Sequence, residues 1–191
     1  MADCIDILES IGQGCEKENQ VGGVNRRVWV TQKSQVASTT EDADGYVNSI
    51  TMGVDNSSDS YKLITVTGKD YTHNGVIEGV IGDNTNTFNH SAAIKIFTAT
   101  PAERVAVETL FKAKDLIVIF QNENDQIEVY GLDKGLKASA FAGGTGTALQ
   151  DDTGMLLTLS GEQRYLPKYF LNGGSLATSI AYLDNISKAV V

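Results

Sequence analysis

The sequence predicts an α+β fold of mostly antiparallel strands, a β-sandwich or barrel with one flanking helix. Three observations lead to this class: many strand-like runs separated by polar turns, one segment with clear helix signals, and 19 glycines against two prolines in 191 residues. Glycine-rich turns are typical of a chain that reverses direction often. We expect one β-rich domain over residues 21–167, an N-terminal arm over residues 1–20 and a C-terminal arm over residues 168–191.

The clearest strands follow residue 115. Residues 116–120 read LIVIF, a continuous apolar run typical of a core strand. After a polar turn, residues 127–131 read IEVYG, so the two runs predict a hairpin. Residues 155–159 read MLLTL between two turn signals and predict a further strand.

Earlier runs also have the alternation and the β-branched content of strands: residues 26–31, 46–54, 61–67, 75–81 and 92–98. An acid-rich polar turn is expected over residues 39–45. We expect the runs 26–31 and 46–54 to pair as a hairpin. The runs 61–67 and 75–81 predict a second, long hairpin that stands out from the main body.

Residues 100–112 carry the helix signals. Thr100 and Glu103 have the spacing of a capping box, and Pro101 occupies the first helical position. The apolar residues recur with helical spacing and form one stripe: Val107, Leu110 and Phe111. Such a short amphipathic helix needs a sheet on which to bury this stripe.

Both ends of the chain differ in character from the middle. Residues 1–20 mix isoleucine and leucine with acids and then glycines, which fits a short helix or an arm that docks on a neighbour. After Pro167, apolar residues recur with small residues between them, which fits either a terminal helix or an extended tail: Leu176, Ile180, Leu183 and Ile186. Either form could reach a neighbouring subunit.

The formal net charge of −9 argues against a nucleic-acid-binding module, because such modules gather Lys and Arg. An acidic or neutral channel would still let DNA slide past without trapping it. The simpler interpretation is that the acidity provides solubility. The start of the chain has no basic segment followed by an apolar one, and no run approaches the roughly 20 apolar residues of a membrane helix. We therefore expect synthesis in a cytoplasm and no membrane contact.

Candidate chemical motifs are incomplete. Residues 143–147 read GGTGT but lack the Lys-Ser/Thr ending of a phosphate-binding loop. The acidic turns at residues 42–45 and 151–154 resemble fragments of calcium loops without their full ligand set, so turn chemistry explains them. Cys4 and Cys15 are expected to be reduced thiols, the alternative being a disulfide formed in oxidising surroundings.

Catalysis has few candidate groups. No Gly-x-Ser-x-Gly motif is present, and His73 and His90 both fall in polar strand-edge or loop contexts. A pair of carboxylates stays open as a possibility because acids are abundant. We assign no catalytic, cofactor-binding or metal-binding residue, expect no cofactor, and do not expect an enzyme.

Several segments resemble those of structural tail proteins of phages that infect Bacteroidetes, including the crAss-like phages. These are the capped helix over residues 100–112, LDKGL at residues 132–136, DDTGMLLTLSGE at residues 151–162, and Cys15 followed by GGVNRRVWV at residues 22–30. The similar patterns are short and together cover about two thirds of the chain.

The resemblance implies a tail-tube-like fold, assembled into stacked rings around a channel for the genome. It implies a virion protein, assembled in the cytoplasm of the host bacterium, in a tail or a head-to-tail connector. The implied partners are identical subunits, six or twelve in a ring, and adjacent tail or connector proteins, with DNA only as a passing polymer. The bridging elements would be residues 61–81, 1–20 and 168–191.

Two other classes of function stay open. A β-sandwich binding module, such as a capsid decoration or host-surface adhesion protein, would carry an exposed aromatic cluster, and the seven tyrosines are scattered in the sequence. The other class is an enzyme of unknown type. The ring is favoured because strand edges left unpaired in one copy find partners in identical neighbours.

Overall fold

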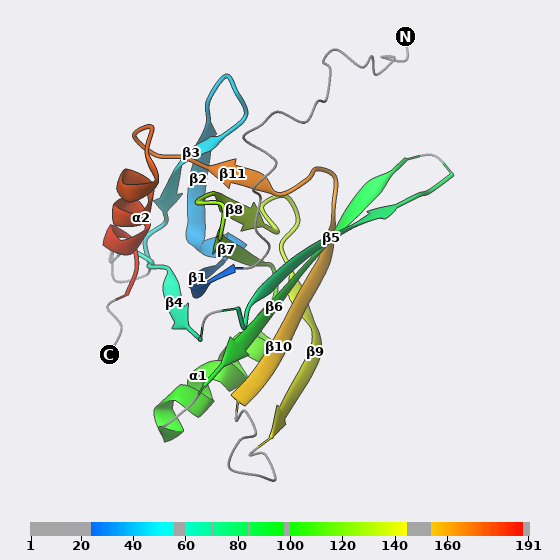
Figure 1. The fold of residues 1–191 in the computed structure, drawn as a ribbon, viewed down its shortest axis with the longest axis vertical. Coiled ribbons are helices and arrows are strands. Elements are labelled where there is room, and N and C mark those ends of the chain that lie inside the picture. Colours follow the sequence, from blue (N-terminus) through cyan, green and yellow to red (C-terminus); the bar gives the residue numbers. More distant parts are fainter. Residues whose placement is uncertain are drawn as a thin grey trace.

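The computed structural model describes residues 24–55, 60–69, 71–83, 85–97, 100–144 and 154–188. Within them, eleven strands form two sheets, accompanied by two α-helices and a short 3-10 helix at Lys33–Gln35 (Figure 1). The expected class is confirmed: a mostly antiparallel, sandwich-like α+β fold with a flanking helix. Neither α-helix in this part of the chain is long and apolar enough to cross a membrane.

The larger sheet has seven strands. In spatial order they are β2 (Val36–Glu41), β3 (Val47–Met52), β11 (Lys168–Phe170), β8 (Ile127–Tyr130), β7 (Leu116–Asn122), β1 (Val24–Gln32) and β4 (Ile64–Thr67). Neighbouring strands are antiparallel except for β3 and β11, which are parallel. The predicted hairpin at residues 116–131 is confirmed as β7 and β8.

The smaller sheet has four strands. In spatial order they are β5 (Asn74–Val80), β6 (Thr87–Ile96), β10 (Gly154–Gln163) and β9 (Lys137–Gly144). The predicted strand at residues 92–98 is confirmed over residues 92–96 as the end of β6, and the predicted strand at residues 155–159 is confirmed as part of β10; β6 and β10 pair over nine residues. The β5–β6 hairpin projects from the body of the molecule (Figure 1).

The core has two parts, one on each face of the seven-stranded sheet. Leu116, Val118 and Phe120 point into the space between the sheets, whereas Ile117 and Ile119 point to the opposite face, which α2 (Leu176–Asn185) covers. Both faces of β7 are therefore buried, which explains why residues 116–120 form an unbroken apolar run rather than an alternating one.

The helix α1 (Pro101–Lys112) forms as predicted. The backbone N–H of Thr100 donates to Glu103 Oε2 at 2.7 Å, and the N–H of Glu103 donates to Thr100 Oγ1 at 3.3 Å. Val107 and Leu110 are buried in the core between the sheets. Phe111 completes the stripe only in part: it is 42% exposed, and its ring centroid lies 5.3 Å from that of Phe141 in β9.

The expected C-terminal arm is wrong over residues 168–188. Its strand β11 lies inside the seven-stranded sheet, and its helix α2 buries Leu183 completely. The Tyr182 hydroxyl donates to the carbonyl of Ile50 at 3.0 Å and ties α2 to β3. Of the two open alternatives, the terminal helix is the one that forms, and it packs on its own sheet because its apolar residues cover Trp29 and the neighbouring core. The N-terminal arm predicted over residues 1–20 lies outside the described residues.

Two predicted hairpins are also wrong. The run 26–31 pairs as β1 with β7 and β4, while the run 46–54 pairs as β3 with β2, part of which falls in the expected polar turn at residues 39–45. The runs 61–67 and 75–81 belong to different sheets, as β4 and β5. The projecting hairpin is instead β5 with β6, because the chain crosses from one sheet to the other between Thr67 and Asn74.

Candidate functional site

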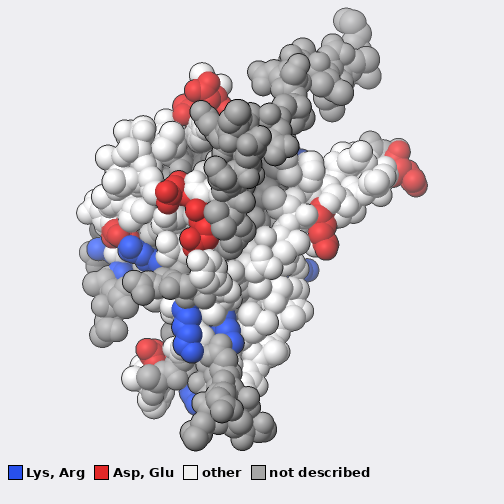
Figure 2. Space-filling model, in the orientation of Figure 1, with Lys and Arg blue, Asp and Glu red and all other residues white. Residues whose placement is uncertain are grey.

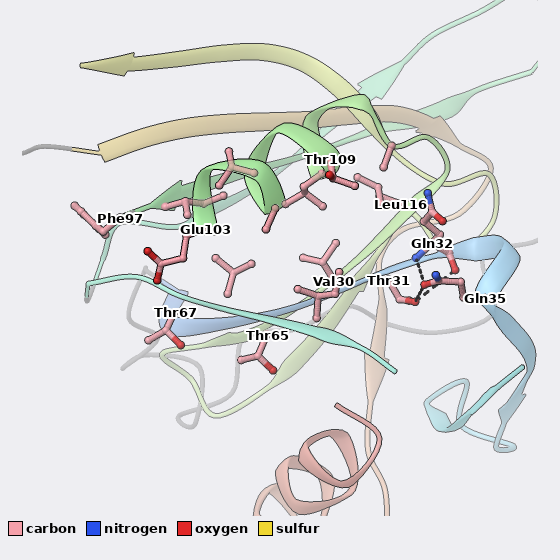
Figure 3. Close-up of a pocket in the computed structure, with 17 residues that line it drawn as sticks. Val30, Thr31, Gln32, Gln35, Thr65, Thr67, Phe97, Glu103, Thr109 and Leu116 are labelled. Carbon is pink, nitrogen blue, oxygen red and sulfur yellow. Dashed lines mark hydrogen bonds between the residues drawn. The ribbon is translucent and has the colours of Figure 1, made fainter. Parts of the chain in front are cut away.

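A cleft lies between α1 and the β1–β4 edge of the seven-stranded sheet (Figure 3). It has a volume of about 460 Å³, within the range of small-molecule sites in proteins. Its walls are mainly apolar, with Val30, Ile64 and Val66 on the sheet and Ala106, Val107 and Leu110 on the helix. β4 is the edge strand on this side of the sheet, and all four of its residues line the cleft.

Several polar groups of the cleft already have partners. Gln35 Oε1 accepts from the Thr31 hydroxyl at 3.2 Å and from the Gln32 N–H at 3.5 Å. At the other end, the Glu103 carboxylate accepts the Thr100 N–H of the helix cap. These groups form no pair of nucleophile and base, so the geometry suits an apolar occupant rather than a reaction.

A smaller hollow of about 200 Å³ lies beside His90, Asp133, Tyr165 and Lys168. His90 Nδ1 accepts the N–H of Gly131 at 3.3 Å, and Nε2 contacts the carbonyl of Tyr165 at 2.9 Å, so the ring is neutral and protonated on Nε2. Burial lowers the pKa of His90 below its ordinary value, although the bond to the Tyr165 carbonyl opposes this shift. Both ring nitrogens serve the fold, which leaves neither for proton transfer.

An ion pair stands at the rim of this hollow. Arg164 donates from Nε to Asp133 Oδ2 at 2.8 Å and from Nη2 to Asp133 Oδ1 at 2.5 Å. These hydrogen bonds lower the pKa of Asp133 to about 2, so the carboxylate is charged at neutral pH. A carboxylate locked by a guanidinium is a poor general base.

The histidines are not in the polar positions that the sequence indicated. His73 and His90 are 3% and 2% exposed. His73 Nδ1 accepts the backbone N–H of Lys95 at 3.2 Å. Each imidazole bonds to backbone groups of other segments of the chain. The polar residues beside both histidines in the sequence do not distinguish this buried role from a position in a surface loop.

The candidate ligand loops are turns or lie outside the described residues. Asp42 Oδ1 accepts the N–H of Asp44 at 3.0 Å and of Tyr46 at 2.9 Å, which confirms turn chemistry there. Gly143 and Gly144 end β9, while residues 145–153 and both cysteines are not described. No group of three potential metal ligands occurs among the residues that are placed.

Four strand edges are open within the described part of the chain: those of β2 and β4 in the larger sheet, and of β5 and β9 in the smaller one. At β4, Leu63 is already paired with the chain at Ile186 and Lys188, but residues 64–67 have no outer partner there. The edges of β5 and β9 carry exposed apolar side chains: Val76, Ile77, Val80 and Phe141. Exposed edges of this kind are templates for pairing with another chain.

The outer face of the four-stranded sheet carries mainly uncharged side chains and four charged ones. The register places a row of alanine, hydroxyl and amide side chains on it, opposite the core: Asn89, Ser91 and Ala93 of β6, Thr158 and Ser160 of β10, and Ala140 and Ala142 of β9. The same face carries Lys95 and Glu162 towards its two ends, Glu78 of β5 opposite Asn89, and Lys137 of β9 opposite Ser160. Its larger apolar side chains are Val76, Val80 and Leu156. The surface over β9 and β10 in Figure 2 is correspondingly almost free of charged groups.

Comparisons with protein-family models, with curated proteins and with solved structures found no match. Sequence reasoning missed the cleft beside α1 and the position of the projecting hairpin, because both depend on which sheet each strand joins. The spacing of apolar residues in α1 was the one available signal for a helix face that lines the cleft.

Proposed function

We propose that this chain is a structural virion protein that forms a ring around the DNA channel of a phage tail or head-to-tail connector. The observation that carries the proposal is the four-stranded sheet, whose outer strands β5 and β9 each present an open edge. The two edges lie on opposite sides of one sheet. Pairing β9 of one copy with β5 of the next would repeat head-to-tail, and such a contact closes into a ring when its rotation allows.

The outer face of the same sheet supports a channel. In a ring continued through β5 and β9, one face of this sheet would turn inward and the core face would turn away from the axis. Besides alanine and uncharged polar side chains, this lining carries two lysines at separate positions, Lys95 and Lys137, and two glutamates, Glu78 and Glu162, so it offers no cluster of cations to hold phosphate. DNA would pass such a lining without sequence-specific contact.

The class of particle and its other partners rest on the resemblance in short segments. On this proposal, the subunit assembles in the host cytoplasm and contacts neighbouring tail or connector proteins through the two ends of the ring. No enzymatic step is part of the proposal.

Native mass spectrometry and electron microscopy of the purified chain test the ring. We expect a closed oligomer, most simply of six or twelve subunits. Ala140→Lys places a charge at the exposed β9 edge and should dissociate the oligomer. Ala37→Lys makes the same change at the exposed edge strand β2 of the other sheet and should leave it intact. A chain that stays monomeric at high concentration would refute the proposal.

A second candidate function has one observation in its favour. Although the tyrosines are scattered in sequence, Tyr46 and Tyr169 lie with ring centroids 6.2 Å apart, and the 56% exposed Tyr165 lies on the segment that leads into β11. Lys168 Nζ lies 6.0 Å from the centroid of Tyr165. A sugar-binding module presents aromatic rings in this way. Glycan-array binding by the monomer, lost in Tyr165→Ala, would favour the adhesion protein over the ring.

A further inference from the structure

We propose that the apolar stretch at residues 5–11 of the N-terminal segment docks in the cleft between α1 and β4 of its own copy. The docking goes beyond the ring and does not depend on it, because it concerns a single chain. Residues 1–23 lie outside the described part of the chain. Three properties identify them as the occupant: the chemistry of the cleft, the point at which they join the fold, and their own sequence.

The cleft suits an occupant that is apolar and can pair with a strand edge. Ile64 lines it and is 47% exposed, and the α1 residues Ala106, Val107 and Leu110 give it further aliphatic wall. Covering such surface is favourable by about 25 cal/mol per Å². Residues 64–67 of β4 have no outer strand partner within the described residues. An extended segment paired with this edge would turn every second side chain into the cleft.

The N-terminal segment joins the fold beside this cleft. It enters the larger sheet at Val24, the first residue of β1, and β1 is the strand that pairs with β4. In that pair Ile64, at the far end of β4, lies opposite Val30. The rise of a strand places Val30 about 20 Å from Val24. The connecting residues 12–23 span up to about 40 Å, so the stretch 5–11 can reach the full length of β4.

The sequence of the segment matches the cleft. Residues 5–11 read IDILESI and contain four large aliphatic side chains, whereas residues 12–23 read GQGCEKENQVGG and have no comparable run. In an extended chain Ile5 and Ile7 lie on one side and Asp6 on the other. Two aliphatic side chains would therefore enter the cleft while the carboxylate stays in water.

Charge favours the same occupant. Residues 1–23 carry five carboxylates against one lysine. Within two residues of the cleft lining, by contrast, the described chain has three acids, Glu103, Glu108 and Asp115, and seven cations: Lys33, Lys62, Lys69, Lys95, Arg104, Lys112 and Lys114. Among these, Lys62, Arg104 and Lys114 are exposed and take part in no ion pair of the described residues. They can meet carboxylates of the docked segment.

The connection favours docking within one copy. A segment tethered through 12 residues acts on its own cleft at an effective concentration in about the millimolar range, which exceeds that of a second copy in dilute solution. The resemblance to phage tail proteins instead implies that residues 1–20 bridge subunits. The two placements predict different products of cross-linking.

Protection of a cysteine placed in the cleft tests the docking in the full chain. All proteins carry Cys4→Ser and Cys15→Ser, and Ala140→Lys at the β9 edge keeps ring contacts out of the measurement. Ile64→Cys then provides the one thiol, and its rate of reaction with a maleimide reports whether the cleft wall is covered. The matched reporter is Val105→Cys, which is 62% exposed on α1 and outside the cleft lining.

We expect Ile5→Asp together with Ile7→Asp to raise the rate of the Ile64→Cys thiol by about tenfold or more, the factor that corresponds to the loss of one buried aliphatic side chain. The rate of the Val105→Cys thiol should not change. Equal rates of the Ile64→Cys thiol with and without the two isoleucine changes would overturn the docking.

A charge control lies in the connecting residues. Gln13→Asp together with Gln20→Asp adds the same charge to the segment without touching the apolar stretch. This double variant should leave the Ile64→Cys thiol protected. A rise equal to that caused by the two isoleucine changes would assign the effect to charge and overturn the apolar docking.

Disulfide trapping locates the segment. Ile5→Cys or Ile7→Cys, each combined with Ile64→Cys, should give an internal disulfide in at least one of the two proteins, because a disulfide requires Cα atoms within about 7 Å. The yield should exceed that of the same pairs with Val105→Cys. In mixtures of two differently tagged chains, bridges found only between chains would overturn the placement in the same copy.

The outcomes separate this docking from the ring. A protected cleft in a chain that forms no closed oligomer without Ala140→Lys would leave the docking standing and overturn the ring. Closed rings with an unprotected cleft would do the reverse.

Discussion

Replacing Gly75 by alanine should destabilise the base of the projecting hairpin. Gly75 is the second residue of β5, and a Cβ there would lie 2.6 Å from the hydroxyl oxygen and 2.8 Å from Cζ of Tyr130 in β8. The Tyr130 ring cannot swing away easily, because it packs edge-on against Phe120 at a centroid distance of 5.3 Å and its hydroxyl donates to Glu128 Oε2 at 2.9 Å. The β5 backbone must therefore shift.

The expected loss in the free energy of unfolding is about 1–3 kcal/mol, the usual cost of one extra carbon in a packed site. Gly79 on the same strand has no atom within 4 Å of its hypothetical Cβ. Gly79→Ala should therefore stabilise the chain by about 0.4–1 kcal/mol through the unfolded state. The two variants should differ by about 1.5–4 kcal/mol.

Urea denaturation at pH 7, at a concentration where the chain is monomeric, measures both variants. In a Tyr130→Phe background the closest clash is removed, so Gly75→Ala should cost about 1 kcal/mol less than in the wild-type chain. Two results would refute this account of how the hairpin is anchored: equal stabilities of Gly75→Ala and Gly79→Ala, or a cost of Gly75→Ala that is unchanged in the Tyr130→Phe background.

Three further predictions concern the helix cap, the buried His90 and the Asp133–Arg164 ion pair. Thr100→Ala should lose about 1 kcal/mol of stability in urea denaturation because it removes the α1 cap, whereas Thr109→Ala on the exposed face of the same helix should lose less. The neutral His90 ring stabilises the fold above its ordinary pKa of about 6.5, so stability should fall as the pH drops below that value, and His90→Gln should flatten this part of the profile. Asp133 has a pKa of about 2 in the fold, so its stabilising effect should be lost between about pH 4 and pH 2, and Asp133→Asn should show no such loss even if it is less stable at pH 7.

Strands and the capped helix could be predicted because their signals are local. The run at residues 116–120 is apolar throughout because both of its faces are covered, and the Thr100–Glu103 spacing satisfies the first amides of a helix in any context. Pairing could not be predicted in the same way. Trp29 and Val30 alternate between two cores as a strand requires, but their partners in β7 lie almost 90 residues away.

The connection between β4 and β5 shows why the sequence predicted the wrong pair of strands for the projecting hairpin. Residues 61–67 and 75–81 each have a strand pattern, and the polar residues between them resemble a hairpin tip. In the fold, His73 is buried in this connection, and a Cβ on Gly68 would lie 2.5 Å from its Nε2 atom. A glycine required by close approach to a buried imidazole looks the same in sequence as a glycine in a surface turn.

The candidate site was less predictable than the fold. The cleft depends on β4 being the edge strand that faces α1, and the pattern of residues 61–67 does not show which strand lies at the edge. The three residues of β11 are too few for any alternation to be recognised, although they join two parts of the larger sheet.

The position of β11 has a consequence for biosynthesis. The β2–β3 pair contacts the rest of its sheet through β11, whose residues 168–170 follow all the other described strands in the chain. Until they emerge, the early pair has no strand to join it to β8, and Ile50 lacks the Tyr182 hydroxyl bonded to its backbone. A nascent chain can thus complete this sheet only after β11 has emerged, and a product truncated before residue 168 would keep an unfinished β3 edge on which proteases and chaperones can act.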